Sequence, residues 1–104
     1  MINAKEEFIG FVRDRKLVCA TVSFEFWEGD IQSFKTHLKC NYTPEEYEEF
    51  LNKLDINYHD GYGSQHMFGT VWFLDGTWAD RCDYDGAEWW EIRQRPEIPE
   101  YLFR

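Results

Sequence analysis

The 104-residue sequence lacks most of the features that identify enzymes and membrane proteins. No apolar run approaches the roughly 18 residues that a membrane-spanning helix needs. The GxSxG, P-loop and GxGxxG patterns are missing, and the GYG of residues 61–63 is too short to cradle a phosphate. These absences argue against an enzyme and against a membrane protein. We therefore expect no catalytic residue, no cofactor and no membrane partner.

Cysteine is scarce, and its spacing is uninformative for metal binding. The chain has three cysteines and three histidines, namely Cys19, Cys40, Cys82, His37, His59 and His66. An odd, widely spaced set of cysteines does not form a disulfide framework. No CxxC or HxxxH pair is present to anchor a metal site, although the six side chains could supply ligands if the fold gathered them. We expect free thiols and no metal.

Basic residues are scarce after Asn41. Residues 1–41 hold six acids and six bases, residues 42–74 six acids and one base, and residues 75–104 eight acids and four bases, for a net charge of −9. Such a field repels nucleic acid and anionic membranes and attracts basic surfaces, although acidity also simply keeps a small protein soluble.

Acids precede the first apolar stretch and no small-residue cleavage site follows it, so we expect a cytoplasmic protein without a secretory signal.

The first part of the chain predicts a helix and a hairpin. Asn3 and Glu6 have the spacing of a helix N-cap and its partner, and apolar residues at helical spacing follow over residues 4–14. Residues 17–27 then alternate with a β period, as do residues 33–40, with a turn at residues 28–30. In the second of these strands Phe34, Leu38 and Cys40 are expected to face the core.

A second helix begins at Thr43, which has Pro44 at the first helical position and Glu46 as its capping-box partner. Its apolar stripe consists of Tyr47, Phe50, Leu51 and Leu54. Its acids include Glu45, Glu48 and Glu49. Acids near a helix N-terminus are favoured by the helix dipole by roughly 0.3–1 kcal/mol each, so these glutamates either stabilise their own helix or face a partner.

Three strands are predicted next, joined by the dipeptides Asp75-Gly76 and Asp85-Gly86. Asp-Gly between alternating strands is typical of a two-residue type I′ turn. Two-residue turns would pair Phe73 with Trp78, Trp72 with Ala79 and Val71 with Asp80. The second turn pairs Asp80 with Glu91, Cys82 with Trp89 and Ala79 with Ile92. The apolar residues of the proline-containing end, Ile98, Tyr101, Leu102 and Phe103, are expected to cover an edge of the core.

This pairing divides the three strands into two faces. One face has Trp72, Ala79 and Ile92 at its centre, flanked by Leu74 and Trp90, and is expected to pack on the helices. The other face has Val71, Asp80 and Glu91 at its centre, flanked by Phe73, Trp78, Cys82 and Trp89. Directly opposed carboxylates are costly to bury, so this second face is expected to contact solvent.

Exposed tryptophans beside fixed acids often mark an interaction site. Two alternatives remain open at this point. The C-terminal end or the first hairpin could fold over these aromatics. Asp80 and Glu91, on the order of 5 Å apart, could also form a carboxylate pair like that of a retaining glycosidase, but so short a chain offers no deep sugar cleft.

Residues 69–102 contain a DGTW turn, a YDGxEWW turn and a final PxIP, and in this they resemble small phage and prophage proteins. The resemblance covers about a third of the chain, and its motifs specify turns and strands more than chemistry. It implies a short, acidic protein of a mobile element. Proteins of that kind are often inhibitors of host or defence proteins, including anti-CRISPR proteins that occupy a nucleic-acid site by charge mimicry.

The sequence therefore predicts one α+β domain over residues 1–104, in the order α-β-β-α-β-β-β, with an antiparallel sheet covered on one face by the helices. The predicted function is an inhibitor that binds a basic surface of a host or defence protein, without contacting nucleic acid itself. The predicted partner-binding residues are Asp80, Glu91, Trp78, Trp89, Asp83, Glu88, Glu45, Glu48 and Glu49. The alternatives are a self-associating accessory protein, as a homodimer, and an aromatic-lined ligand-binding module.

Overall fold

The computed structural model describes residues 2–26, 33–58, 65–94, 96 and 98–103. The turn predicted at residues 28–30 and His59, one of the side chains weighed as a metal ligand, lie outside these ranges. The elements, in chain order, are β1 (Ile2–Asn3), α1 (Ala4–Val12), β2 (Leu17–Phe24), β3 (Phe34–Leu38), α2 (Pro44–Lys53), β4 (Asn57–Tyr58), β5 (Met67–Phe73), β6 (Trp78–Tyr84), β7 (Ala87–Arg93) and the 3-10 helix η1 (Glu100–Leu102).

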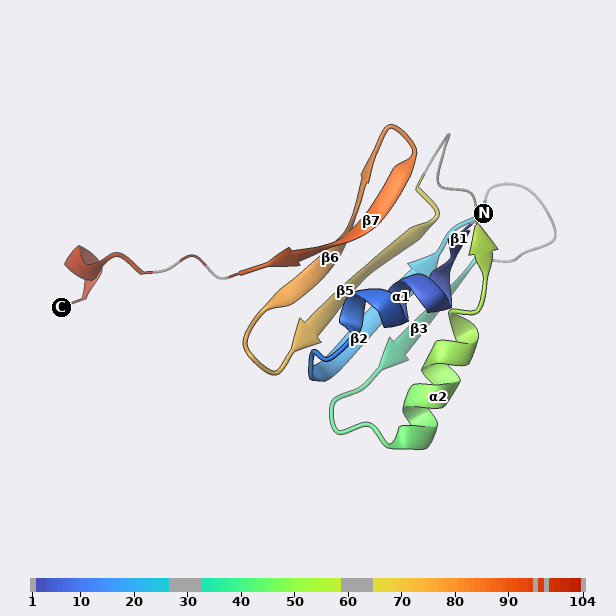
Figure 1. The fold of residues 1–104 in the computed structure, drawn as a ribbon, viewed down its shortest axis with the longest axis horizontal. Helices are drawn as coiled ribbons and strands as arrows, with labels where there is room; N and C mark the ends of the chain where they lie inside the picture. The colour runs from blue at the N-terminus through green and yellow to red at the C-terminus, as the bar shows by residue number, and fades with distance from the viewer. Residues whose placement is uncertain (1, 27–32, 59–64, 95, 97, 104) are drawn as a thin grey trace.

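The predicted class is confirmed: the fold is α+β, with two helices and a five-stranded antiparallel sheet in the order β3-β2-β5-β6-β7 (Figure 1). The predicted order is confirmed only in part. The short strands β1 and β4, which pair with each other in a separate two-stranded sheet, were not predicted. Two-residue strands carry no periodic pattern that could reveal them in a sequence.

Both helices begin where the sequence predicts. The Asn3 side chain accepts a hydrogen bond from the Glu6 backbone N–H at 3.0 Å. Thr43 and Glu46 form a complete capping box, with Pro44 as the first residue of α2. These side chains satisfy backbone N–H groups that have no partner within the helix. Neither helix in the described part of the chain is long and apolar enough to cross a membrane.

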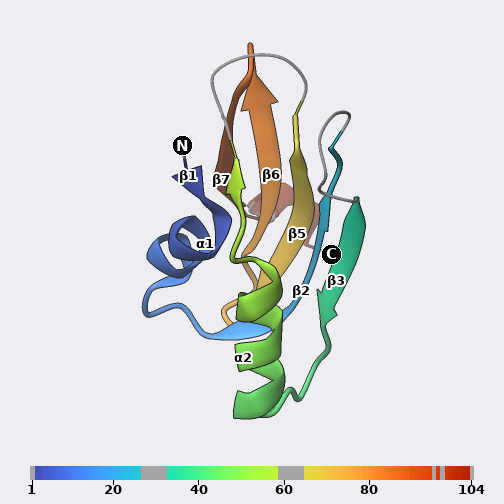
Figure 2. The same ribbon diagram turned by 90° about the vertical axis from the view of Figure 1, so that its right-hand side faces the viewer.

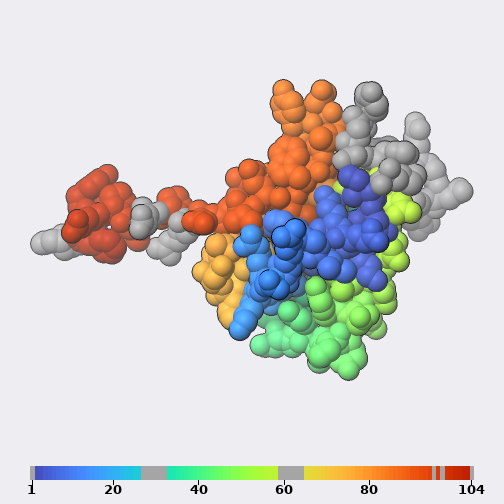
Figure 3. Space-filling model, in the orientation of Figure 1, coloured from blue at the N-terminus to red at the C-terminus, as the bar shows by residue number. Residues whose placement is uncertain are grey.

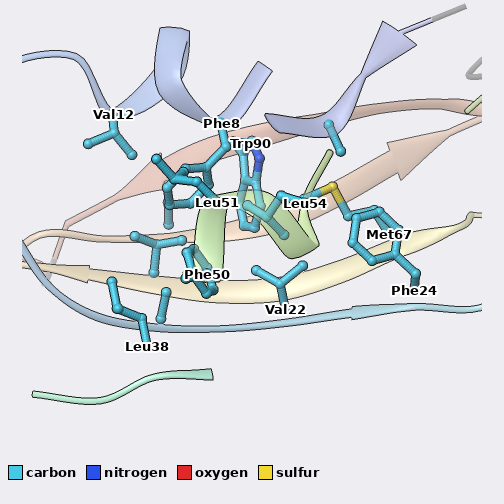
Figure 4. Close-up of a cluster of buried hydrophobic side chains, with 14 of the residues drawn as sticks. Phe8, Val12, Val22, Phe24, Leu38, Phe50, Leu51, Leu54, Met67 and Trp90 are labelled. Atoms are coloured by element: carbon cyan, nitrogen blue, oxygen red, sulfur yellow. The ribbon is translucent and has the colours of Figure 1, made fainter. Parts of the chain in front are cut away.

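The core lies between the helices and one face of the five-stranded sheet (Figures 2 and 4). Phe8 of α1 is central to it, because its ring packs edge-on against Phe50 of α2 and against Trp90 of β7. The sheet supplies alternate residues of each strand, which is why they share one face. The other fully or nearly buried members are Ala4, Val12, Ala20, Val22, Phe24, Leu38, Leu51, Leu54, Tyr58, Met67, Val71, Phe73 and Ala79.

Gly69 makes room for the large ring of Trp90. It lies on the core face of β5, opposite Val22 of β2. A Cβ atom at this position would lie 2.6 Å from the Thr21 carbonyl oxygen and 3.0 Å from the Trp90 ring. Any other residue would therefore push a strand or the indole out of place.

The first Asp-Gly turn differs from the prediction, and this reverses the faces of β5. Val71 pairs with Ala79, and Trp72 with Trp78, one residue out of the predicted register. The Asp75 carboxylate accepts hydrogen bonds from the Thr77 N–H at 2.9 Å and from the Thr77 hydroxyl at 2.6 Å. The loop therefore consists of three residues, Leu74, Asp75 and Gly76. Of these, Gly76 has a positive φ of 89°. A three-residue loop of this kind is a common hairpin connection.

The shifted register moves Val71 and Phe73 into the core and leaves Trp72 42% exposed. A slip of one residue has this effect because side chains alternate between the two faces of a strand. The second turn is as predicted. Asp85 and Gly86 both have positive φ, and Asp80 pairs with Glu91, Cys82 with Trp89.

Two further predictions are wrong. Cys40 lies beyond the end of β3 and is exposed, because the chain turns at Asn41, whose φ is 62°. The apolar residues near the C-terminus do not cover the core. Ile98, Tyr101, Leu102 and Phe103 are 42–83% exposed, and this part of the chain projects away from the body (Figures 1 and 3).

Candidate functional site

The sheet face opposite the core, called here the outer face, is covered by neither helix. The strand pairings place the alternate side chains of all five strands on it. Its members are Cys19, Thr21, Ser23, Lys35, His37, Phe68, Thr70, Trp72, Trp78, Asp80, Cys82, Trp89, Glu91 and Arg93. None of these is buried.

Three tryptophans dominate the part of the outer face formed by β5, β6 and β7. Trp72 and Trp78 are direct cross-strand neighbours, and Trp89 lies further along β7. Trp72 is 42% exposed and Trp89 38% exposed, whereas Trp78 is half-buried. Exposed aromatic area of this size on a rigid, paired backbone is unusual away from an interaction site.

Arg93 resolves the repulsion between the two opposed carboxylates. Its Nε lies 3.3 Å from Asp80 Oδ2, and its Nη2 lies 3.6 Å from Glu91 Oε2. Its guanidinium carbon also lies 5.9 Å from the centroid of the Trp78 ring, within the range of a cation–π interaction. Thr70 donates a further hydrogen bond to Asp80 at 3.0 Å. The carboxylates are therefore fixed by neighbours of the same face.

Cys82 completes this cluster. Its thiol lies 3.3 Å from Glu91 Oε2 and donates a hydrogen bond to it, and Arg93 donates to the sulfur at 3.4 Å. Burial, followed by the hydrogen bond to Glu91, raises the pKa of the Cys82 thiol above its ordinary value, and Arg93 only partly opposes this. A thiol with a raised pKa is a poor nucleophile at neutral pH. The arrangement gives the outer face fixed polar groups rather than a reactive centre.

The outer face is close to electrically neutral, which the sequence did not predict. Lys35 and Arg93 balance Asp80 and Glu91. The edge strand β3 is the basic side, where His37 also shares a 2.9 Å hydrogen bond with the Thr21 hydroxyl. The acids and the arginine lie across the face on β6 and β7. The large negative charge of the chain therefore belongs to other surfaces.

The structure brings together only four of the nine predicted partner-binding residues. Asp80, Glu91, Trp78 and Trp89 share the outer face, and Trp72 joins them. The remaining acids lie elsewhere: Asp83 is exposed near the tip of the β6–β7 hairpin on the core side of the strand, and Glu45, Glu48 and Glu49 are exposed on α2. The missed residue, Trp72, was assigned to the core because the first turn was given two residues.

Glu88 is not an exposed acid, as the prediction requires, but a buried one, with 5% exposure. Its carboxylate accepts hydrogen bonds from the backbone N–H groups of His66 at 2.7 Å and Met67 at 3.2 Å. It also accepts one from Nε of Arg81 at 3.3 Å. Glu88 therefore fixes the start of β5 to the β6–β7 hairpin, a structural role that leaves it no free oxygen to offer a partner.

Arg81 is the centre of this buried network. Its side chain is fully buried, and its Nη1 lies 2.9 Å from Glu7 Oε2 of α1. It also donates to the hydroxyl of Tyr58, which in turn donates to Glu7. The guanidinium carbon lies 5.6 Å from the Tyr58 ring centroid and 5.4 Å from that of Trp90. The network joins α1, β4, β6 and β7.

The tyrosine of this network is held in its protonated form. Burial, followed by the hydrogen bond to Glu7, raises the pKa of the Tyr58 phenol far above its ordinary value, although Arg81 opposes the shift. A neutral hydroxyl can both accept from Arg81 and donate to Glu7.

Within the described ranges no three histidine, cysteine or acidic side chains lie close enough together to hold a metal ion.

Cys19 and Cys40 are the cysteines that approach one another. Burial, followed by a hydrogen bond with Cys40, raises the pKa of the Cys19 thiol. All three thiols are free.

Comparison with protein-family models, curated proteins and solved structures found no match. The resemblance of residues 69–102 to phage and prophage proteins therefore stays a prediction, and the site has to be interpreted from its own geometry.

Proposed function

We propose that this chain is a protein-binding domain that acts without catalysis, and that the outer face is its contact surface. The observation that carries the proposal is the group of three tryptophans, Trp72, Trp78 and Trp89, on a sheet face that neither helix covers. Tryptophan and arginine are the residues most often found at the energetic centre of protein interfaces. Burying these aromatic rings against another protein is favourable because it removes their apolar surface from water.

The strand pairing makes the outer face suited to tight binding. Trp72, Trp78 and Trp89 are held on three adjacent strands, so little backbone freedom is lost when a partner docks. Arg93, Asp80 and Glu91 already contact one another and need no rearrangement. Fixed charges of both signs beside an aromatic centre give orientation and specificity more than raw affinity.

We propose a host or defence protein as the partner, in keeping with the resemblance to phage-type inhibitors. The net charge of −9 favours a partner with a basic surface and disfavours direct binding of nucleic acid. The net charge would steer such a partner towards the protein at long range, and the tryptophans of the outer face would make the contact. The protein would then block the partner by occupying its surface.

A second mode of binding, charge mimicry of nucleic acid, is favoured by a different observation. Glu45, Glu48 and Glu49 are all exposed on α2, away from the tryptophans. In that mode α2 would be the contact surface, and affinity would fall steeply as salt increases. The two modes therefore differ both in the residues they need and in their response to salt.

Capture of a partner from bacterial host lysate by the tagged protein, followed by affinity measurement with the purified partner, tests the proposal. We expect the double variant Trp72→Ala/Trp89→Ala to bind at least about 100-fold more weakly, because each interface tryptophan commonly contributes about 2 kcal/mol or more. Ile9→Ala is the matched control, because Ile9 of α1 is 43% exposed but lies off the outer face. It should bind as the wild type does.

A charge-only variant, Glu45→Gln/Glu48→Gln/Glu49→Gln, separates the two modes. Our proposal predicts a change of less than about fivefold, since surface charges mainly affect the rate of association. Undiminished binding by the tryptophan variant, together with loss of binding by the glutamine variant, would contradict the outer face as the contact surface and support charge mimicry.

A further inference from the structure

The end of the chain beyond β7 exposes a second set of apolar side chains. Tyr101 is 83% exposed, Leu102 63% and Phe103 58%, and Ile98 is also exposed. The hydrogen bonds of η1 are local: Leu102 N–H donates to the Pro99 carbonyl at 2.9 Å, and Phe103 N–H to the Glu100 carbonyl at 3.1 Å. We call residues 98–103 the C-terminal segment. It projects well away from the body of the protein (Figure 3).

The C-terminal segment leaves the body beside the outer face. Arg93, the last residue of β7, pairs with Trp78 and lies over its ring. The chain therefore leaves the sheet at the end where Trp72 and Trp78 are neighbours, and the C-terminal segment begins five residues after Arg93. An apolar segment and an uncovered aromatic face thus lie close together along the chain, and each lacks a partner among the described residues.

Proline favours an extended backbone before η1 rather than an immediate reversal of the chain over its own sheet. Pro96 and Pro99 both restrict the backbone, and Pro99 has φ −58° and ψ 145°, the extended polyproline conformation. The residue before a proline is also biased towards extended backbone. A segment directed outwards in this way reaches a neighbouring molecule more readily than its own outer face.

We propose that the C-terminal segment of one copy docks on the outer face of a second copy, and that the second copy reciprocates. The inference rests on the proposed function, because it uses the same contact surface: in the absence of a host partner, each outer face is capped by the segment of another copy. Complete burial of an aromatic side chain removes roughly 150–250 Å² from water, and the tryptophans of the outer face, which are already more than half buried, add less than this each. Together with the largely exposed Tyr101, Leu102 and Phe103, two reciprocal contacts bury on the order of 1,000 Å², about the least that a specific interface needs.

The apolar character of both surfaces determines the response to salt. Two copies that each carry a net charge of −9 repel one another. Raising the salt concentration screens this repulsion and leaves the apolar contact intact. The dimer should therefore be as stable or more stable at 0.5 M salt than at about 0.05 M, because exposed charges are largely screened beyond about one Debye length.

Light scattering after size-exclusion chromatography gives the first test. The wild type is expected to form a concentration-dependent dimer. A segment variant, Leu102→Asp/Phe103→Asp, and a face variant, Trp72→Ser/Trp89→Ser, should each raise the dimer dissociation constant at least 100-fold. Ile9→Asp, an exposed position off both surfaces, should leave it unchanged. A monomeric wild type would contradict the proposal, as would a segment variant that still dimerises through the outer face alone.

Mixing the two variants gives the sharper test, because each retains what the other has lost. We expect unlabelled face variant, added to the ¹⁵N-labelled segment variant, to shift the indole N–H resonances of Trp72, Trp78 and Trp89 in NMR spectra. A protein carrying both sets of substitutions should cause no shift. Absence of a shift in the first titration, or an equal shift in the second, would overturn the inference.

The two proposals fail separately. A monomeric wild type whose host-partner capture still depends on Trp72 and Trp89 would remove the dimer and leave the proposed function intact. If the dimer forms as expected but partner capture is unchanged when Trp72 and Trp89 are replaced, the dimer proposal stands and the outer face is not the surface that binds a host partner.

Discussion

Replacing Arg81 with methionine is expected to lower the free energy of unfolding by about 3–5 kcal/mol, because it leaves buried charges without a partner. The Arg81 side chain is fully buried, and that of Glu88 is fully buried too. Methionine fills a similar volume but offers no hydrogen-bond donor to Glu88 or to Glu7. Glu88 would then have to stay ionised away from water or take up a proton, and the partly exposed Glu7 would lose its ion partner.

Chemical denaturation followed by circular dichroism measures this effect. In a domain of this size a loss of about 1 kcal/mol lowers the melting temperature by roughly 4–8 °C, so Arg81→Met should lower it by well over 10 °C. Arg93→Met is the matched control, since the Arg93 side chain is 42% exposed and its ion pairs contact solvent. Exposed pairs contribute about 1 kcal/mol at most. Equal effects from both variants would contradict the structural role of the buried network.

Trp90→Ala and Trp89→Ala are expected to differ greatly in their effect on the free energy of unfolding, although the two residues are adjacent in sequence. Trp90 is 7% exposed, and its ring packs on Phe8, Phe11 and the guanidinium of Arg81. Its removal leaves a large cavity in the core, and we expect a loss of about 3–5 kcal/mol in the free energy of unfolding. Trp89 lies on the outer face, so its removal should change stability by less than about 1 kcal/mol.

The same pair separates stability from binding. Trp89→Ala should weaken partner binding while the protein stays folded, and Trp90→Ala should lower the melting temperature and, at temperatures where the protein remains folded, leave affinity nearly unchanged. Denaturation curves and affinities measured on the same preparations give both quantities. A folded Trp89→Ala variant with full affinity would argue against a contribution of Trp89 to the contact surface.

Local chemistry made part of this fold predictable. Thr43, Pro44 and Glu46 specify the start of α2 through contacts within four residues, and the structure contains each of those contacts. Asp85-Gly86 likewise fixes the pairing of β6 with β7, because both residues adopt positive φ. In both cases the interactions that decide the geometry lie within a few residues of one another.

The register of β5 against β6 depended on contacts that the spacing of residues in the sequence does not specify. Asp75-Gly76 has the same two letters as the second turn, but the hydroxyl and N–H of Thr77 bind Asp75 and lengthen the loop by one residue. The threonine after Asp-Gly was the available indication. That one residue decided which face of β5 is exposed, and so moved Trp72 into the candidate site.

Burial of charge was harder still to predict. Arg81 contacts Glu7 across 74 positions of the sequence, and Glu88 binds backbone N–H groups more than 20 positions away. In the sequence Glu88 looks like one more acid of an acidic chain. Its contacts with the start of β5 and with Arg81 distinguish it from the exposed acid Glu91.

The most direct test of the central claim is ¹⁹F NMR of the protein labelled with 5-fluorotryptophan, recorded with and without its purified partner, with resonances assigned by Trp→Phe substitution. If the outer face is the contact surface, binding should shift the resonances of Trp72, Trp78 and Trp89 and abolish their sensitivity to exchange of H₂O for D₂O, while the buried Trp90 changes little. A complex that forms while all three outer-face tryptophans keep their solvent sensitivity would contradict the account.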